Sequence, residues 1–463
     1  ARLNHTGIIT CYGLFPLALL LLETFLIERR IATAVGFSVV ASMIVLARNQ
    51  VALMLCIVLI AFLLREVARA RQPLAYVRAR ASGLLASGAI VAGLTFVPLL
   101  LTLQLAELSN RPAVQLADAL QASLYPANLA SLAVPNVFGS HAPGFGYWGP
   151  SYANLPDVGA TDDSFNYLFI GSAPTLLLLW LGFATGKLGE CRYRSLTLLL
   201  GVSTLFALGR YTPLYAFVFE HIPGFTFFRR PIDATFVMLI AMSMMVGQLL
   251  ADLTRHGVPR LRALPLATVL AATVAIVASA ISISAVSGHG DEAVRAIAMA
   301  ACLCCVPIAA LRWADTTARS ILSVRCIAAV SVLELLVWNA ASRLNAEHRK
   351  HYELLEAVAT QDAPALRLLG DELNRRHLEG ARPRVEIIGL HGPWQNLSMV
   401  RKFEATNGYN PLRIGLYELG HETDVPTAVV LNEAVELANG YSTDDSGRFV
   451  NGVLASIARE VRR

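Results

Sequence analysis

The sequence predicts an all-α polytopic membrane protein that carries a small α/β domain at its C-terminal end. Of its 463 residues, 55% are hydrophobic and 15% are charged, and the mean hydropathy is +0.54. This composition is too apolar for an ordinary soluble protein. Long apolar stretches recur up to residue 341, and the hydropathy falls after that point. We therefore expect a transmembrane domain over 1–341 and a soluble domain over 342–463.

Ten apolar stretches are candidates for membrane-spanning helices, because a helix needs about 20 apolar residues to cross the hydrocarbon core. The second and third are short and are joined only by "ARNQ", which suits a tight hairpin that does not fully cross. The ten stretches are 8–27, 31–47, 50–64, 82–104, 166–186, 195–209, 232–251, 263–286, 295–311 and 320–341.

The Lys and Arg residues of the loops predict the orientation, since cytoplasmic loops carry the excess of positive charge. One alternate set of loops holds 15 such residues and the other set holds seven. The richer set is expected in the cytoplasm, so the loops 105–165 and 210–231 and the C-terminal domain are expected on the extracytoplasmic side. The net charge of +5 is spread along the chain, which argues against a nucleic-acid partner.

The segment "EHIPGFTFFRRPIDATF" (220–236) places Arg229 and Arg230 in the same outer loop as Arg210, against the charge rule. Two interpretations stay open on residue chemistry alone. The guanidinium groups can grip a phosphate bidentately, or they can extend toward lipid headgroups beside an aromatic belt.

The long outer loop 105–165 offers candidate substrate contacts. Tyr147, Trp148 and Tyr152 present flat aromatic faces on which sugars stack, in a Pro- and Gly-rich stretch (125–152) that suits an ordered lid rather than a helix. Asp157, Asp162 and Asp163 can act as a general base or hold a divalent cation. "TDDS" (161–164) is equally an ordinary helix N-cap.

Several ionisable residues lie at membrane depth, among them His5 at the start of the first span and Glu334 in the outer half of the last. Such groups mark functional sites or pair inside a helical bundle. The run "CLCC" (302–305) has the composition of a metal or lipidation site. Because no His or carboxylate nearby completes a metal site, its cysteines are expected instead to be small buried hydrophobes.

In the C-terminal domain, 363–380 has the apolar spacing of a helix, and "RVEIIGL" (384–390) and "TAVVL" (427–431) have the composition of strands. "NGYNPLRI" (407–414) suits a turn before a short helix. The basic tail "ASIAREVRR" is expected to lie against a membrane or to pack on the domain.

Several motifs together resemble the YfhO family of bacterial membrane proteins. They are "ARLNHTG", "LARNQVAL", "SLAVPNVFG" with "YWGP", "ALGRYTPLY" with "IPGFTFFRRP", and "NLSMVRKFEATNGYNPLRI" (396–414). The resemblance covers most of the chain to about residue 420. It implies a GT-C-like fold and a glycosyltransferase of the inner membrane, which moves a sugar from a polyprenyl-phosphate donor to an extracytoplasmic glycan or lipid acceptor.

On this resemblance, Arg229 and Arg230 would hold the donor phosphate with help from Arg210, and His5 and His221 are further candidates for the same site. GT-C enzymes carry their catalytic carboxylate in the first outer loop, after the first helix, and no such segment precedes Ala1. We expect that segment to lie upstream, or Asp157, Asp162, Asp163 or Glu220 to serve as the catalytic carboxylate instead.

A flippase for lipid-linked sugars and a non-catalytic envelope assembly protein are the alternative functions. The donor substrate is the polyprenyl-phosphate sugar, and a divalent cation is the one candidate cofactor.

Overall fold

The computed structural model describes residues 6–47, 49–108, 115–139, 146–151, 168–222, 225–227, 230–314, 317–339, 363–378, 419, 426–441, 451 and 453–458. The chain divides into two compact units. One comprises Ala1–Phe96 with Ala113–Ala346, and the other comprises Val97–Pro112 with Glu347–Arg463.

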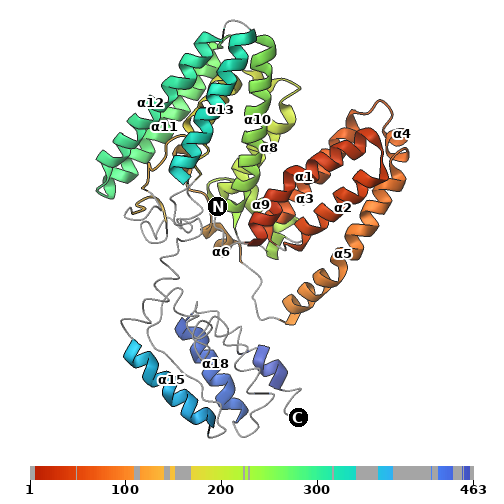
Figure 1. Ribbon diagram of the computed structural model, residues 1–463, viewed down its shortest axis with the longest axis vertical. Coiled ribbons are helices and arrows are strands. Elements are labelled where there is room, and N and C mark those ends of the chain that lie inside the picture. The colour runs from red at the N-terminus through yellow and green to blue at the C-terminus, as the bar shows by residue number, and fades with distance from the viewer. Residues whose placement is uncertain are drawn as a thin grey trace. The chain divides into compact units, whose positions relative to one another are not determined.

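The N-terminal helices form the first group of the larger unit (Figure 1). α1, α2 and α3 pack against one another, and α4 packs on α3. The Asn49 side chain caps α3 by accepting a hydrogen bond from the Ala52 N–H (2.9 Å), and Gly83 lets α5 approach the ring of Phe25. The helices are α1 (Thr6–Glu28), α2 (Ile31–Leu46), α3 (Gln50–Arg69), α4 (Pro73–Arg78) and α5 (Ala81–Leu108), of which the residues from Val97 onward belong to the other unit.

A second group of helices follows the long loop (Figure 1). α10 packs against α8 and α13, α12 packs between α11 and α13, and α7 contacts both α12 and α13. α7 continues directly into a π-helical segment, η4. The helices are α7 (Ser172–Leu177), η4 (Leu178–Ala184), α8 (Arg194–Ala207), α10 (Thr235–His256), α11 (Ala263–Val286), α12 (Gly290–Trp313) and α13 (Thr317–Asn339).

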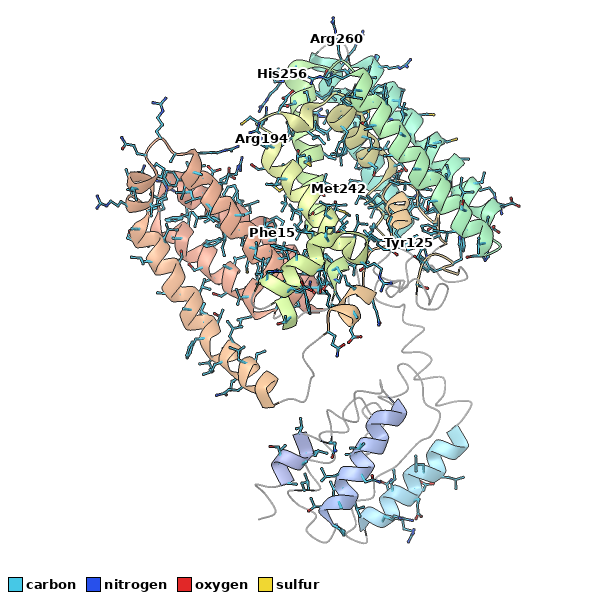
Figure 2. The ribbon with its side chains drawn as sticks, turned by 180° about the vertical axis from the view of Figure 1, so that it is seen from behind. Phe15, Tyr125, Arg194, Met242, His256 and Arg260 are labelled. Carbon is cyan, nitrogen blue, oxygen red and sulfur yellow. The ribbon has the colours of Figure 1, made fainter. Side chains whose placement is uncertain are left out.

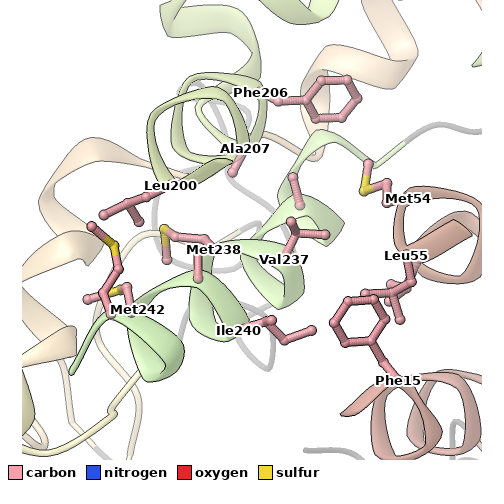
Figure 3. Packing of buried hydrophobic residues seen from close by; sticks show 14 of the residues in the cluster. Phe15, Met54, Leu55, Leu200, Phe206, Ala207, Val237, Met238, Ile240 and Met242 are labelled. Atoms are coloured by element: carbon pink, nitrogen blue, oxygen red, sulfur yellow. The ribbon is translucent and has the colours of Figure 1, made fainter. Parts of the chain in front are cut away.

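One hydrophobic core joins the two groups (Figure 3). Phe15 of α1 and Leu55 of α3 face Ile240 of α10, and Phe206 and Ala207 of α8 belong to the same cluster. The contact joins the end of α8 to the first turns of α3 and α10.

Within the described residues, seven helices are long and apolar enough to cross a membrane. They carry large apolar side chains that are exposed at the protein surface, such as Leu85, Leu264 and Val286. Such a surface suits a lipid solvent rather than water. α2, α7 with η4, and α8 are shorter apolar helices. This is an all-α polytopic membrane protein, and each of the ten expected spans coincides with a helix or with α7 and η4.

Four expectations differ from the structure. α3 has 20 residues and is long enough to cross, whereas the hairpin interpretation made it short. The 125–152 stretch contains a 3-10 helix, η1 (Pro126–Leu132), which begins at a proline that fits the first helical turn. Cys302 and Cys305 are exposed on α12 rather than buried. "TAVVL" begins a helix, α18 (Thr427–Tyr441), and is not a strand.

The described part of the C-terminal unit is helical. α15 (Ala363–Leu378) confirms the expected helix, and residues 453–458 are helical as well. Val430 and Ala434 of α18 form a small core with Leu419, Leu454 and Ala458. The described part of the basic tail therefore packs within this unit. The predicted strand 384–390 and the turn 407–414 lie outside the described residues.

Candidate functional site

Three segments distant in the sequence meet near the start of α10. The first is the end of α6 (Leu116–Gln121) with residues 122–124. The second is η6 (Gly209–Tyr211), between α8 and α9 (Pro213–His221), and the third is η8 (Pro231–Ala234). Leu124 N–H donates to the Ala207 carbonyl (2.8 Å), and Ile232 N–H donates to the Ala122 carbonyl (3.2 Å). The long loop and the arginine loop are thereby fixed to each other.

Arg210 is held at this junction by one hydrogen bond from its main chain and one from its side chain. Its N–H donates to Ser123 Oγ (2.9 Å), and its Nε donates to the Leu120 carbonyl (3.2 Å). Gly209 adopts a φ of +49°, and a Cβ at this position would strike Ser123 Oγ and lie 2.8 Å from Cγ of Pro231. The close approach therefore requires glycine, and it leaves the Arg210 side chain exposed.

Arg230 lies beside a set of buried polar groups. Its N–H donates to Gln50 Oε1 at the start of α3 (3.2 Å), and its charge acts on the carboxylate of Asp233. Gln50 and Asp233 are both buried, and among the residues that the structure describes, Gln50 Nε2 and Asp233 Oδ1 have no hydrogen-bond partner. Buried polar atoms without partners are costly, so the described residues leave the hydrogen bonds of this polar centre incomplete.

Aromatic rings surround the same junction. Tyr125 meets Tyr211 edge to face with centroids 5.6 Å apart, and Phe206 lies 4.9 Å from Tyr215. Burial raises the pKa of the Tyr215 hydroxyl, and the Asp233 carboxylate raises it further. Tyr215 therefore remains a neutral hydroxyl at physiological pH. Figure 2 shows Tyr125 far from His256 and Arg260, which lie at the other end of α10.

The other candidates from the arginine loop lie on α9. Glu220 and His221 are both exposed at the end of this helix. His221 Nδ1 lies 2.9 Å from the Phe217 carbonyl, and its ring stacks on that of Phe217. Arg229, His5, Tyr152, Asp157, Asp162 and Asp163 lie outside the described residues.

Tyr147 and Trp148 pack beside the connection between α11 and α12. Trp148 Nε1–H donates to Ser284 Oγ (3.1 Å), and Ser284 Oγ donates to the Val137 carbonyl (3.1 Å). The Trp148 ring stacks on His289 at 4.4 Å. One aromatic face that the sequence suggests for sugar stacking is therefore already covered by a residue of the chain.

Glu334 caps a helix inside the bundle. Its Oε2 accepts hydrogen bonds from the N–H groups of Ser172 (3.0 Å) and Ala173 (3.5 Å) at the start of α7. A carboxylate at a helix N-terminus is stabilised by the unpaired N–H groups and by the helix dipole. Among the described residues there is no group of three or more His, Cys, Asp or Glu side chains suited to a metal ion.

Asp252 organises the opposite end of α10. Its carboxylate lies 2.7 Å from Arg192 Nη1 and 3.8 Å from Lys187 Nζ, and it accepts a hydrogen bond from the Tyr193 hydroxyl (2.5 Å). Burial raises the pKa of Tyr193, and the bond to Asp252 raises it further. Sequence reasoning missed Asp252, Asp233 and Gln50, although polar residues within or beside apolar spans were the available signal.

The family comparison concerns the C-terminal segment. The NusB family model matches residues 407–459. The transcription antitermination protein NusB of Thermotoga sp. (strain RQ2) is 51% identical over 87 residues, which is 19% of this chain and 61% of that protein. NusB of Ruminiclostridium cellulolyticum is 54% identical over 48 residues, which is 10% of this chain and 33% of that protein.

This chain thus spans between a third and about three fifths of the length of these relatives. The match includes α18 and the helical residues 453–458, so the small helical core of the C-terminal unit lies in the segment that is similar to NusB. No solved structure matches the chain.

Proposed function

We propose that the membrane domain is a glycosyltransferase that takes a sugar from a polyprenyl-phosphate donor and delivers it to a glycan or lipid acceptor on the extracytoplasmic side. The observation that carries this proposal is the junction of Arg210 and Arg230. Two arginine-bearing segments are bonded to the same short stretch, 120–124, beside buried polar groups with unsatisfied atoms. The YfhO-like motifs supply the reaction class.

In this mechanism the arginines bind the phosphate of the donor. Guanidinium groups bind phosphate oxygens through charge-assisted, often bidentate hydrogen bonds. The same charges stabilise the negative charge that grows on the leaving phosphate as the glycosidic bond breaks. Tyr125 and Tyr211 provide apolar surface beside the phosphate for the neighbouring part of the donor.

Activation of the acceptor requires a general base. Asp157, Asp162, Asp163 and Glu220 are the proposed candidates. Glu220 is exposed on α9, five residues after the buried Tyr215. The side chain of Asp233 is buried, which suits it to positioning Arg230 better than to contact with an acceptor.

The test is the double variant Arg210→Ala/Arg230→Ala, reconstituted with a radiolabelled polyprenyl-phosphate sugar and membrane acceptors. Loss of one charge-assisted contact costs roughly 1.5–3 kcal/mol, so we expect sugar transfer to fall by at least about a hundredfold for the pair. Arg295→Ala, an exposed arginine at the start of α12, is the matched control.

The alternatives predict different outcomes for the same variant. A flippase loses movement of the lipid-linked sugar between leaflets while having no transfer activity to lose. For an assembly protein, neither sugar transfer nor movement of the lipid-linked sugar changes in the variant. That result would refute the phosphate role of these arginines.

The similarity to NusB favours a second candidate function, restricted to residues 407–459: a role in transcription antitermination, as the name of those relatives states. That role requires the segment to face the cytoplasm, whereas the charge count over the loops puts it on the other side. The side of the membrane on which this segment lies therefore decides whether the second candidate stands.

A further inference from the structure

An open pocket of about 470 Å³ lies at the ends of α1, α3 and α4. It is lined by Arg29, which follows α1, by Glu66 and Arg69 at the end of α3, and by Arg71, Tyr76 and Arg80 around α4. α3 runs from Gln50, beside Arg230, to Arg69. At 1.5 Å per residue, its 20 residues separate the pocket from the proposed donor site by about 30 Å.

Arg80 lines the pocket, and hydrogen bonds to two carbonyls hold its side chain in place. Its guanidinium is buried and donates to the Leu26 carbonyl through Nε (2.8 Å) and Nη2 (2.6 Å), and to the Tyr76 carbonyl through Nη1 (3.0 Å). It also lies over the Tyr76 ring at 3.5 Å. These bonds tie the end of α1 to α4 because Leu26 offers one of the carbonyls left unpaired where a helix ends.

Three other arginines of the pocket have no such partners. The side chains of Arg29, Arg69 and Arg71 form no hydrogen bond or ion pair with any residue that the structure describes. Glu66, the acidic group in the lining, lies 3.5 Å from Arg65, which is outside the lining. Like charges gathered around one cavity repel one another, and an anion in the cavity removes that repulsion.

The level of the pocket at the ends of the membrane spans indicates which kind of anion it binds. Arg69 is the last residue of a candidate span, and Arg29 follows the last residue of another. The pocket therefore lies where apolar helix gives way to polar chain, which is the level of lipid headgroups. Basic pockets between spans at this level suit the phosphates of anionic lipids, and arginine matches phosphate geometry.

We propose that this pocket binds a phosphate-bearing anion, presented to it as the headgroup of an anionic phospholipid. Arg29, Arg69 and Arg71 contact the phosphate oxygens, and Arg80 positions the wall against which the headgroup rests. The site is separate from the proposed glycosyl transfer and does not depend on it.

The test is titration of cardiolipin into the full-length chain in detergent, followed by native mass spectrometry. The variant Arg29→Ala/Arg69→Ala/Arg71→Ala is compared with Arg255→Ala/Arg260→Ala/Arg312→Ala, which removes the same charge from exposed arginines outside the pocket. We expect cardiolipin affinity to fall at least about tenfold in the pocket variant and to change little in the control. Arg71→Gln alone, in the exposed connection after α3, provides a milder variant if the triple one does not fold.

A second arm uses inorganic phosphate and pyrophosphate in the absence of lipid. Pocket-dependent binding of cardiolipin, with weak binding of the free anions, supports the headgroup source. Pocket-dependent binding of the free anions without cardiolipin binding supports a soluble phosphate ligand and overturns the lipid assignment. If neither ligand binds, or the pocket and control variants lose affinity equally, the site itself is refuted.

Discussion

Gly209 lies where the long loop and the arginine loop meet, and its lack of a side chain allows both contacts. A Cβ would meet Ser123, whose hydroxyl accepts the Arg210 N–H, and would press on Pro231, which precedes Asp233 by two residues. One glycine thus allows the Arg210 segment to approach both Ser123 and Pro231 closely, and the proposed phosphate site depends on this approach.

Gly209→Ala is expected to destabilise the protein. The left-handed backbone alone costs an L-residue about 1–2 kcal/mol, and the clash with Ser123 adds to that cost. The measurement is the free energy of unfolding in detergent. Gly201→Ala is the control, since it lies in α8 with nothing within 4 Å of the new Cβ, and there alanine is neutral or slightly stabilising. Equal effects at the two positions would contradict the role of Gly209.

Glu334 shows how a single side chain satisfies a helix start inside the bundle. Glu334→Leu leaves the Ser172 N–H buried without a partner, at a cost of about 1–3 kcal/mol. Glu334→Gln keeps an acceptor oxygen and should cost less. Thermal unfolding of the two variants tests this expectation. If the Glu334→Leu and Glu334→Gln variants lose the same amount of thermal stability, the hydrogen bonds of the cap contribute little, and the carboxylate has another role.

At the scale of elements, α15 carries a local charge cluster that a pH titration can test. Hydrogen bonds from Arg375 and then Arg376 lower the pKa of Glu372 from 4.5 to about 2. The contacts measure 2.7–2.9 Å. Because the pKa is lowered in the fold, this pairing stabilises the helix above pH 4.5 and is lost as the pH falls toward 2. Glu372 is exposed, so the effect on stability is small.

The expected result is a Glu372 titration midpoint well below 4.5 in carboxyl NMR spectra of the glutamate-labelled chain. Glu372→Gln assigns the signal. Arg375→Ala/Arg376→Ala should return the midpoint to about the value of an isolated glutamate. If the Glu372 midpoint is the same in the original chain and in the Arg375→Ala/Arg376→Ala variant, these arginines do not pair with Glu372 in solution.

α18 illustrates why an element was misassigned from local composition. The valines and threonine of "TAVVL" favour a strand, but the residues that follow are good helix formers, "NEAVELA". In the structure Val430 and Ala434 lie one turn apart and face Leu454 and Ala458, which are spaced in the same way. The helical period over 15 residues outweighs the β-branched start.

Over the whole molecule, the distribution of Lys and Arg residues predicts the membrane topology, and this prediction can be tested. Cys191 is exposed in the basic loop near Asp252, which the charge count assigns to the cytoplasm. Glu220 is exposed at the opposite side of the bundle. In a chain whose other cysteines are replaced, Cys191 should react with a membrane-impermeant maleimide only after the cells are permeabilised.

A cysteine introduced as Glu220→Cys, with Cys191 also replaced, should react in intact cells. The reverse pattern would overturn the orientation and place the C-terminal unit in the cytoplasm. It would also favour the second candidate function for residues 407–459.

The apolar pattern was enough to predict the helical spans, because a helix in lipid must be apolar over a fixed length whatever it packs against. The sequence also indicated which arginines stand out, since the predicted orientation puts them on the side where positive charge is sparse. The folded chain was needed to reveal that the segments of Arg210 and Arg230 both contact residues 120–124, and that Arg29, Arg69 and Arg71 line one pocket. These groupings rest on contacts such as that between Ser123 and Arg210, 87 residues apart, and no local pattern encodes a contact at that separation.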